Sequence, residues 1–224
     1  MPDTPAPVPA PPASVPEVPD LVAVLVRLGA DGDGAASVQG DLLARWSEPH
    51  RGYHDSRHLA EVLARVDVLA GHADSPDLVR LAAWWHDAVH EGRAGEDERA
   101  SADLASRQLR GLGLPAADAA RVADLVLVTT RHEARDGAAD AAVLCDADLG
   151  VLAAPPERYD TYAADVRREY AHVPDAAFAA GRAAVLRRLV AADRLYRTPT
   201  AAAWEAAARA NVSRELAVLA ARRP

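Results

Sequence analysis

Histidine and aspartate side chains stand at spacings in this chain that could support metal chemistry. The stretch "GYHDSRHL" places His54 and His58 four residues apart. Further along, His86 and Asp87 are adjacent in "WWHDAVH", and Asp148 follows in "CDADLG". Imidazole and carboxylate ligands together suit Mn, Fe, Zn, Co or Ni, and carboxylates also suit Mg. These residue types therefore predict a site for a divalent metal ion, without identifying the metal.

Helical spacing directs several of these side chains toward a core. Val62 and Val66 lie four and eight residues beyond His58, so a helix would place all three on one face. Asp148 lies in the apolar line of "AAVLCDADLGVLA", which predicts that its carboxylate also faces inward. Asp146 is displaced from it by about 160° of helical turn, because an α-helix turns once in about 3.6 residues. We therefore expect Asp148, rather than Asp146, to face the site.

Charged groups on core-facing stripes need partners. His86, His90 and His132 also fall on the apolar faces of their segments. One inward histidine is more often a satisfied core residue than a ligand, but burying an unpaired carboxylate costs several kcal/mol. The chain has no lysine, so its 25 basic residues are all arginine. Arginine pairs or a divalent cation could compensate the carboxylates. Because four separate helices carry the same exception, the pattern favours the cation.

The elements that must position these residues are helical. Alanine and leucine dominate, aromatic residues are only 4% of the chain, and this composition favours helix over strand. We expect an all-α fold with one domain over residues 20–224, preceded over residues 1–19 by a disordered tail in which repeated proline prevents helix formation. Helical patterns cover residues 20–29, 36–47, 54–71, 76–90, 96–112, 115–132, 140–153, 156–172, 174–193 and 199–221.

The segment "DGDG" at residues 31–34 resembles the start of a calcium-binding loop. Position 42, where such a loop carries a glutamate ligand, is Leu42. We therefore interpret the segment as a turn. Asp20, just before the first helical pattern, is the residue type expected at a helix N-cap.

The charge balance limits the classes of partner. A formal net charge of -8 argues against a nucleic-acid polymer or a membrane, which usually attract basic patches. Small phosphorylated substrates remain compatible with it. Cys145 is the only cysteine, so we expect a buried thiol, no intramolecular disulfide and a cytoplasmic location. No apolar run approaches the roughly 20 residues of a membrane span, and nothing in the sequence indicates an oligomeric state.

The ordered set of His58, then His86 with Asp87, then Asp148 resembles the HD-domain superfamily of metal-dependent phosphohydrolases. The segments "RGYHDSRHL", "WWHDAVH", "EDERASADL", "CDADLG" and "YAADVRREYAHVPDAAFAAGRAAVLRRL" look like a bacterial branch of predicted phosphohydrolases, and the resemblance covers most of the chain after residue 36. It implies an HD-type helical bundle in which these four residues are the metal ligands.

The resemblance also implies a role for His54, which matches a proton-donating histidine of related cyclic-nucleotide phosphodiesterases. Those proteins carry asparagine next, whereas this chain has Asp55. Asp55 either hydrogen-bonds His54 and raises its pKa or is solvated. His90 and His132 are candidates for a second metal site or for contact with a metal-bound water.

These expectations combine into one mechanism, the hydrolysis of a phosphoester bond in a nucleotide or other small phosphorylated metabolite. A metal-activated water attacks, Asp87 accepts its proton, and His54 protonates the departing oxygen. Arg51, Arg131 and Arg182 are candidates for binding the phosphate, although each is more often expected to be an exposed arginine that contacts nothing. Two other functions stay open: a di-iron oxygenase on the same scaffold, and a non-catalytic module that binds a nucleotide or a partner protein.

Overall fold

The computed structural model describes residues 18–221, whose regular elements are all helices. These residues form ten α-helices and three short 3-10 helices, with no strand among them. The predicted all-α fold is therefore confirmed. The predicted proline-rich tail, residues 1–19, lies outside the described residues except for its last two positions.

Helix α4 is the centre of the N-terminal part of the fold. It packs against α1, α3, α5, α6 and α7, and nearly all of its side chains after Asp77 are buried. Its position explains its composition, because a helix covered on all sides must be apolar all round. The helices of this part are α1 (Leu21–Arg27), α2 (Gly32–Trp46), α3 (Ser56–Leu69), α4 (Pro76–Trp85), α5 (Asp97–Gly111), α6 (Ala116–Val128) and α7 (Ala139–Asp148), with a 3-10 turn at Ala70–His72.

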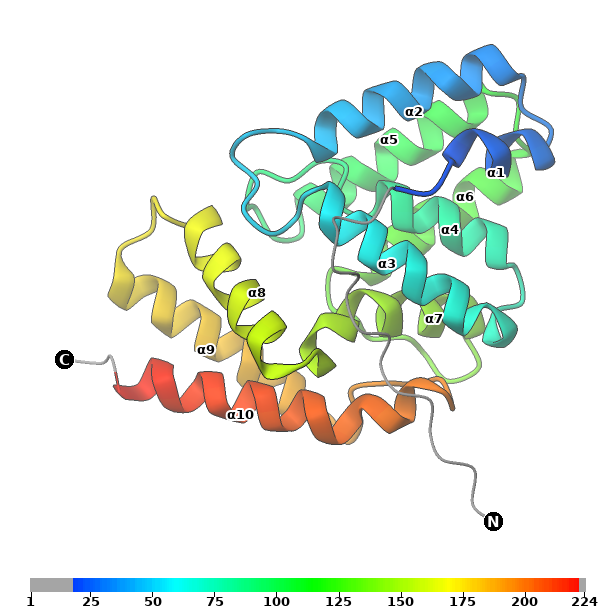
Figure 1. The fold of residues 1–224 in the computed structure, drawn as a ribbon. Helices are drawn as coiled ribbons and strands as arrows, with labels where there is room; N and C mark the ends of the chain where they lie inside the picture. Colours follow the sequence, from blue (N-terminus) through cyan, green and yellow to red (C-terminus); the bar gives the residue numbers. More distant parts are fainter. Residues whose placement is uncertain (1–17, 222–224) are drawn as a thin grey trace.

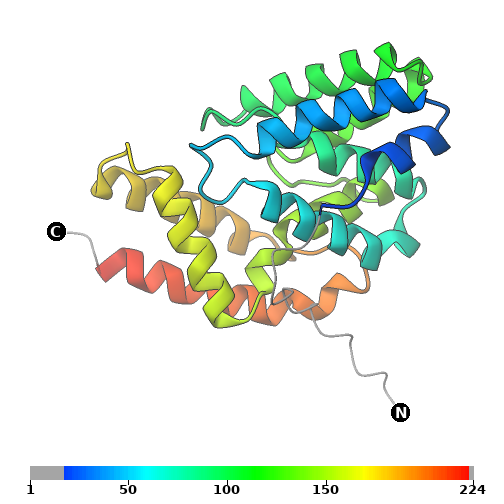
Figure 2. The same ribbon diagram turned by 45° about the horizontal axis from the view of Figure 1, so that its top comes forward.

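The last three long helices lie together on one side of the molecule, opposite α1, α2 and α5 (Figures 1 and 2). Helix α10 packs against α9, α8 and the 3-10 turn η2, which follows α7 directly. The chain thus passes from the N-terminal helices to the C-terminal ones through α7 and η2. The elements are η2 (Leu149–Ala153), α8 (Pro156–Glu169), α9 (Asp175–Ala191), η3 (Ala201–Trp204) and α10 (Glu205–Ala221).

Aspartate caps begin the first two helices. The side chain of Asp20 accepts a hydrogen bond from the amide of Val22, as the sequence predicted for an N-cap. Asp31 likewise accepts from the amide of Gly34, 2.7 Å away. The interpretation of the "DGDG" segment as a separate turn is therefore wrong. The segment is an N-cap followed by the first turn of α2, because the Asp31 carboxylate satisfies an amide that the helix leaves unpaired.

One hydrophobic cluster joins helices from both ends of the described chain. It runs from Leu21 to Leu219 and contains four tryptophans, each at most 1% exposed: Trp46, Trp84, Trp85 and Trp204. The apolar stripe that the sequence predicted on α3 is buried as expected. Cys145 is also buried. No helix among residues 18–221 is long and apolar enough to cross a bilayer.

Candidate metal centre

The N-terminus of α3 fixes the first histidine of the site. Asp55 is the N-cap, and its carboxylate accepts hydrogen bonds from the amides of Arg57 and His58. His54 therefore precedes the helix, whereas the sequence pattern placed it in the first turn. The suggestion that Asp55 tunes His54 is not supported, because its oxygen is engaged in capping.

Helix α4 ends just before the second pair of residues. The sequence pattern continued to His90, but the last helical residue is Trp85. Just past this end, the guanidinium of Arg51 donates to the carbonyl oxygens of Asp87 and Ala88. These contacts hold the turn that follows the helix. The chain turns here and carries the side chain of Asp87 toward α3.

Four side chains from three parts of the chain converge at this turn. The Nε2 atoms of His58 and His86 lie 3.1 Å apart. Asp148 Oδ1, at the end of α7, lies 3.2 Å from His58 Nε2 and 3.6 Å from His86 Nε2. Asp87 Oδ2 lies 3.3 Å from His86 Nε2 and 3.9 Å from His58 Nε2. The four ligands expected from the sequence are thus brought together.

These separations fit a shared cation. Metal bonds to imidazole nitrogen and carboxylate oxygen are about 2.0–2.2 Å long, so neighbouring ligand atoms around one ion lie roughly 3.0–3.5 Å apart. Both histidines are only 1% exposed, and the carboxylates of Asp87 and Asp148 are 18% and 13% exposed. Two carboxylates facing two imidazoles in such a place need positive charge. His58, His86 and Asp148 form a group that could hold a metal ion, with Asp87 beside it.

Surrounding hydrogen bonds orient the candidate ligands. Nδ1 of His86 lies 2.7 Å from the carbonyl oxygen of Ala83, so Nδ1 donates this hydrogen bond and Nε2 is the nitrogen that faces the site. His132 Nε2 donates to the second oxygen of Asp148, at 2.7 Å. Such outer partners are typical of metal-binding histidines and carboxylates. His132 also has φ 54°, an uncommon conformation for a residue with a side chain, and its contact with Asp148 accounts for its placement.

The pKa directions show how strongly the centre favours positive charge. Burial disfavours the charged form of His86, but the nearby charges of Asp87 and Asp148 outweigh it and raise the pKa of His86 to about 9. Burial also acts against ionisation of Asp148, yet the three surrounding histidines hold its pKa well below the usual range. For His58 burial dominates, and its pKa is lowered. A cation would find ionised carboxylates here, together with one imidazole that is already neutral.

A second cluster joins His54 to Glu169, the last residue of α8. His54 Nδ1 lies 2.6 Å and His90 Nε2 2.9 Å from Glu169 Oε1. The other oxygen of Glu169 accepts hydrogen bonds from the amides of Gly52, Tyr53 and His54. The carboxylate of Glu169 therefore holds both the loop before α3 and the ring of His54. His54 Nε2 is left 4.0 Å from Asp87 Oδ2, so the two clusters adjoin.

Charges around His54 favour its protonated form. Burial lowers the pKa of this imidazole, but the hydrogen bond to Glu169 and the charge of Asp87 act more strongly together and raise it above the ordinary value. Burial disfavours the charged form of Glu169 too, yet His54 and His90 hold its pKa far below the usual range. Both shifts favour an imidazolium held by a carboxylate.

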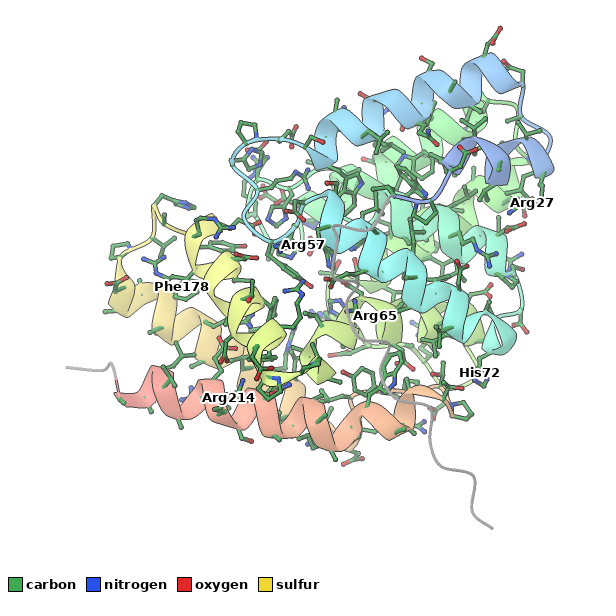
Figure 3. The ribbon with its side chains drawn as sticks, viewed as in Figure 1. Arg27, Arg57, Arg65, His72, Phe178 and Arg214 are labelled. Carbon is green, nitrogen blue, oxygen red and sulfur yellow. The ribbon has the colours of Figure 1, made fainter. Side chains whose placement is uncertain are left out.

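Helix α8 is held against α3 by ion pairs that flank both clusters. Arg57 on α3 contacts Asp165 on α8, and Figure 3 shows Arg57 lying between the two helices. Deeper in the fold, Arg158 on α8 lies 2.8 Å from Glu61 on α3. Gly52 makes a close approach possible, because a Cβ there would lie 2.8 Å from the amide nitrogen of Glu169.

The two histidines proposed for a second metal site lie apart from each other. His132 contacts Asp148, whereas His90 contacts Glu169. His54, His90 and Glu169 together form a group that could hold a metal ion. Of these two histidines, His90 therefore belongs to this second group, whereas His132 contacts a candidate ligand of the first.

The three arginines proposed to bind phosphate differ in their surroundings. Arg51 is 7% exposed, and its donors are bound to Glu48 and to the carbonyl oxygens of His54, Asp87 and Ala88. Arg182 donates to Glu215 and Tyr162, away from the metal centre. Neither offers the free guanidinium that the prediction needed. Arg131 is exposed and precedes His132.

A cavity of about 170 Å³ opens onto the two clusters. His54, Asp87 and Asp148 line it, together with Glu98, Thr129 and Tyr170. The candidate proton donor and two candidate ligands thus face the same space. A group bound in this cavity would contact all three.

Glu169 is the functional candidate that the sequence analysis missed. It lies three residues after Val166 and seven after Tyr162, both buried on α8. The periodicity that singled out Asp148 would therefore have placed Glu169 on a buried face too. Its neighbours in "RREY" are charged, and such a run usually indicates a solvent-exposed segment.

Comparison with known proteins does not assign this arrangement to a family. A scan against protein-family models, a search of curated proteins and a search of solved structures find no match to the chain.

Proposed function

We propose that this chain is a metal-dependent phosphohydrolase of the HD-domain type, acting on a phosphoester bond in a nucleotide or other small phosphorylated metabolite. The observation that carries the proposal is the meeting of His58, His86, Asp87 and Asp148 at ligand-like separations. The order of these residues along the chain is that of the superfamily they resemble. A divalent ion bound there would supply Lewis acidity and a water activated for attack.

The protein's own groups provide the proton transfers. Asp87 Oδ2 faces the cavity next to the candidate ligands, so it is placed to accept a proton from the attacking water. His54 presents Nε2 to the same space while Glu169 holds Nδ1. Its raised pKa supports an imidazolium that donates a proton to the departing oxygen.

Phosphate release is the direct test of this function. Purified protein loaded with Mn²⁺ or Co²⁺ is incubated with a panel of nucleotides, cyclic nucleotides and sugar phosphates, and inorganic phosphate and nucleoside monophosphate are measured. We expect release from at least one substrate class and loss of that release in Asp148→Asn. No release across the panel, from protein shown to contain metal, would contradict the proposal.

The second cluster supports one other function. His54, His90 and Glu169 offer two nitrogens and one oxygen to a further ion, and two adjoining sites of this kind suit a di-iron oxygenase. An iron charge-transfer band with consumption of oxygen would favour that function. One colourless ion per chain would exclude it. A non-catalytic binding module stays a proposal as well, and it predicts that Asp87→Ala leaves metal and ligand binding unchanged.

A further inference from the structure

The cavity at the metal centre is too small for a nucleotide. Its volume is about 170 Å³, whereas sites for small organic ligands are typically about 300–1,000 Å³. A phosphoryl group fits in this space, but a nucleoside attached to it does not. If the proposed function is correct, the remainder of the substrate must therefore lie outside the cavity.

A wider groove adjoins the cavity along three segments. Ala94 and Glu98 line the cavity, while the next residues along the chain, Gly95 and Arg99, line the groove. The end of α6 repeats this pattern, with Thr129 in the cavity and Thr130 in the groove. The groove has a volume of about 1,370 Å³, which is ample for the rest of a nucleotide-sized molecule.

Arginines outnumber acidic residues along this groove. Five line it, against four acidic residues, namely Asp124, Glu133, Asp136 and Asp193. The groove thus carries a small positive excess, whereas the chain as a whole has a net charge of -8. Guanidinium groups are well suited to such a place, because they bind phosphate oxygens in pairs.

Several of these guanidinium groups are available to a ligand. Arg99, Arg131 and Arg135 are exposed, and none has an ion-pair partner within residues 18–221. Arg194 and Arg197 share one carboxylate, that of Asp136, at 3.5 and 3.4 Å. Arg99 and Arg131 stand at the boundary with the cavity, next to Glu98 and His132. Of the three arginines predicted from the sequence to bind phosphate, only Arg131 lies here.

We propose that this groove binds the second anionic group of an extended organic phosphate whose reacting phosphate occupies the cavity. The inference rests on the proposed function, because that function places the reacting phosphate. It narrows the substrate class from any small phosphorylated metabolite to nucleotide-sized compounds that carry two separate anionic groups.

Binding of two nucleotides that differ by one phosphate tests the groove. Adenosine 3′,5′-bisphosphate and AMP are titrated calorimetrically into the metal-loaded full-length chain, and the recovered ligands are checked for hydrolysis. We expect the bisphosphate to bind about tenfold more tightly, the effect of roughly 1.4 kcal/mol from one additional charged contact. In Arg99→Gln/Arg135→Gln this ratio should fall to near unity, because the bisphosphate loses more affinity than AMP does.

Arg110→Gln is the matched control. Arg110 is exposed on the same helix as Arg99, about 16 Å further along its axis from the rise per residue, and does not line the groove. It should keep the wild-type ratio. A wild type without preference for the bisphosphate, or a double variant that keeps the preference, would overturn the proposal. Failure of the proposed function would appear differently, as absent hydrolysis with the affinity ratio intact.

Discussion

The ring of His54 and the carboxylate of Glu169 meet across 115 positions of sequence, with Nδ1 2.6 Å from Oε1. The same carboxylate accepts three backbone amides of the loop that carries His54. Glu169 therefore sets both the position of the loop and the charge of the imidazole. This gives the candidate proton donor a fixed orientation toward Asp87.

Replacing Glu169 with glutamine should move the pH dependence of the reaction. Burial alone disfavours the imidazolium of His54, and Glu169 is the strongest influence that opposes it. Without this negative charge the pKa of His54 falls, so the acid form is lost at a lower pH. We expect the alkaline limb of the kcat profile to shift to lower pH while bound metal stays unchanged. Glu157→Gln, an exposed position on the same helix, is the control. An unmoved limb would refute the role of Glu169.

The two histidines of "GYHDSRHL" should respond differently to alanine. His58→Ala removes a candidate ligand, so we expect the variant to lose bound metal and all activity. His54→Ala removes only the proton donor, which typically contributes about 10²- to 10⁴-fold in rate. We expect it to keep its metal and lose kcat by that factor. Metal analysis and steady-state kinetics on the two variants check this, and equal loss of metal in both would disprove the division of roles.

Gly52 should tolerate no side chain. A Cβ there would lie 2.8 Å from the amide nitrogen of Glu169 and would also collide with the carbonyl oxygen of Asp165. Gly52→Ala should therefore push the loop away from α8, lowering the free energy of unfolding by about 1–3 kcal/mol and reducing kcat with it. Gly40→Ala, in α2 with nothing near its Cβ, should be neutral or stabilise by up to about 1 kcal/mol. Denaturant unfolding of both variants decides the matter, and equal stability would count against the loop packing.

Arg51 should act on stability rather than on substrate affinity. Its donors hold carbonyl oxygens of His54, Asp87 and Ala88. Arg51→Met leaves these acceptors unpaired, so we expect a loss of about 3 kcal/mol or more in the free energy of unfolding. Chemical denaturation measures this directly. A raised KM with unchanged stability would instead restore the phosphate-binding role that the sequence suggested.

Helical periodicity predicts the helices and the inward placement of His58 and Asp148, whereas the set of four candidate ligands follows from the resemblance to the HD-domain superfamily. Helical periodicity reports which face is buried, and a charged residue on a buried face stands out, as Asp148 does. Periodicity does not report the contacts that side chains from elsewhere in the chain make at the end of a helix. Arg51, 36 residues before Asp87, holds the turn that follows α4, and no local pattern at Trp85 reveals that contact.

The sequence also did not reveal which residues, distant along the chain, contact the candidate site residues. Asp55 stands beside His54 in the chain and was the natural candidate to tune it, yet its carboxylate caps α3. Glu169, which contacts His54, is on a helix far along the sequence. Asp146 is a second residue whose partners the sequence did not reveal. It is fully buried, but its carboxylate accepts hydrogen bonds from the amides of Arg197 and Thr198 and does not face the metal centre.

The most direct test of the metal centre compares these two aspartates. Metal content after loading with Mn²⁺ and removal of free ions is measured for the wild type, Asp148→Asn and Asp146→Asn. We expect one ion per chain in the wild type, little or none in Asp148→Asn, and wild-type content in Asp146→Asn. The Asp146→Asn variant should instead lose about 1–3 kcal/mol in its free energy of unfolding. Metal retained by Asp148→Asn at the wild-type level would contradict the proposed centre.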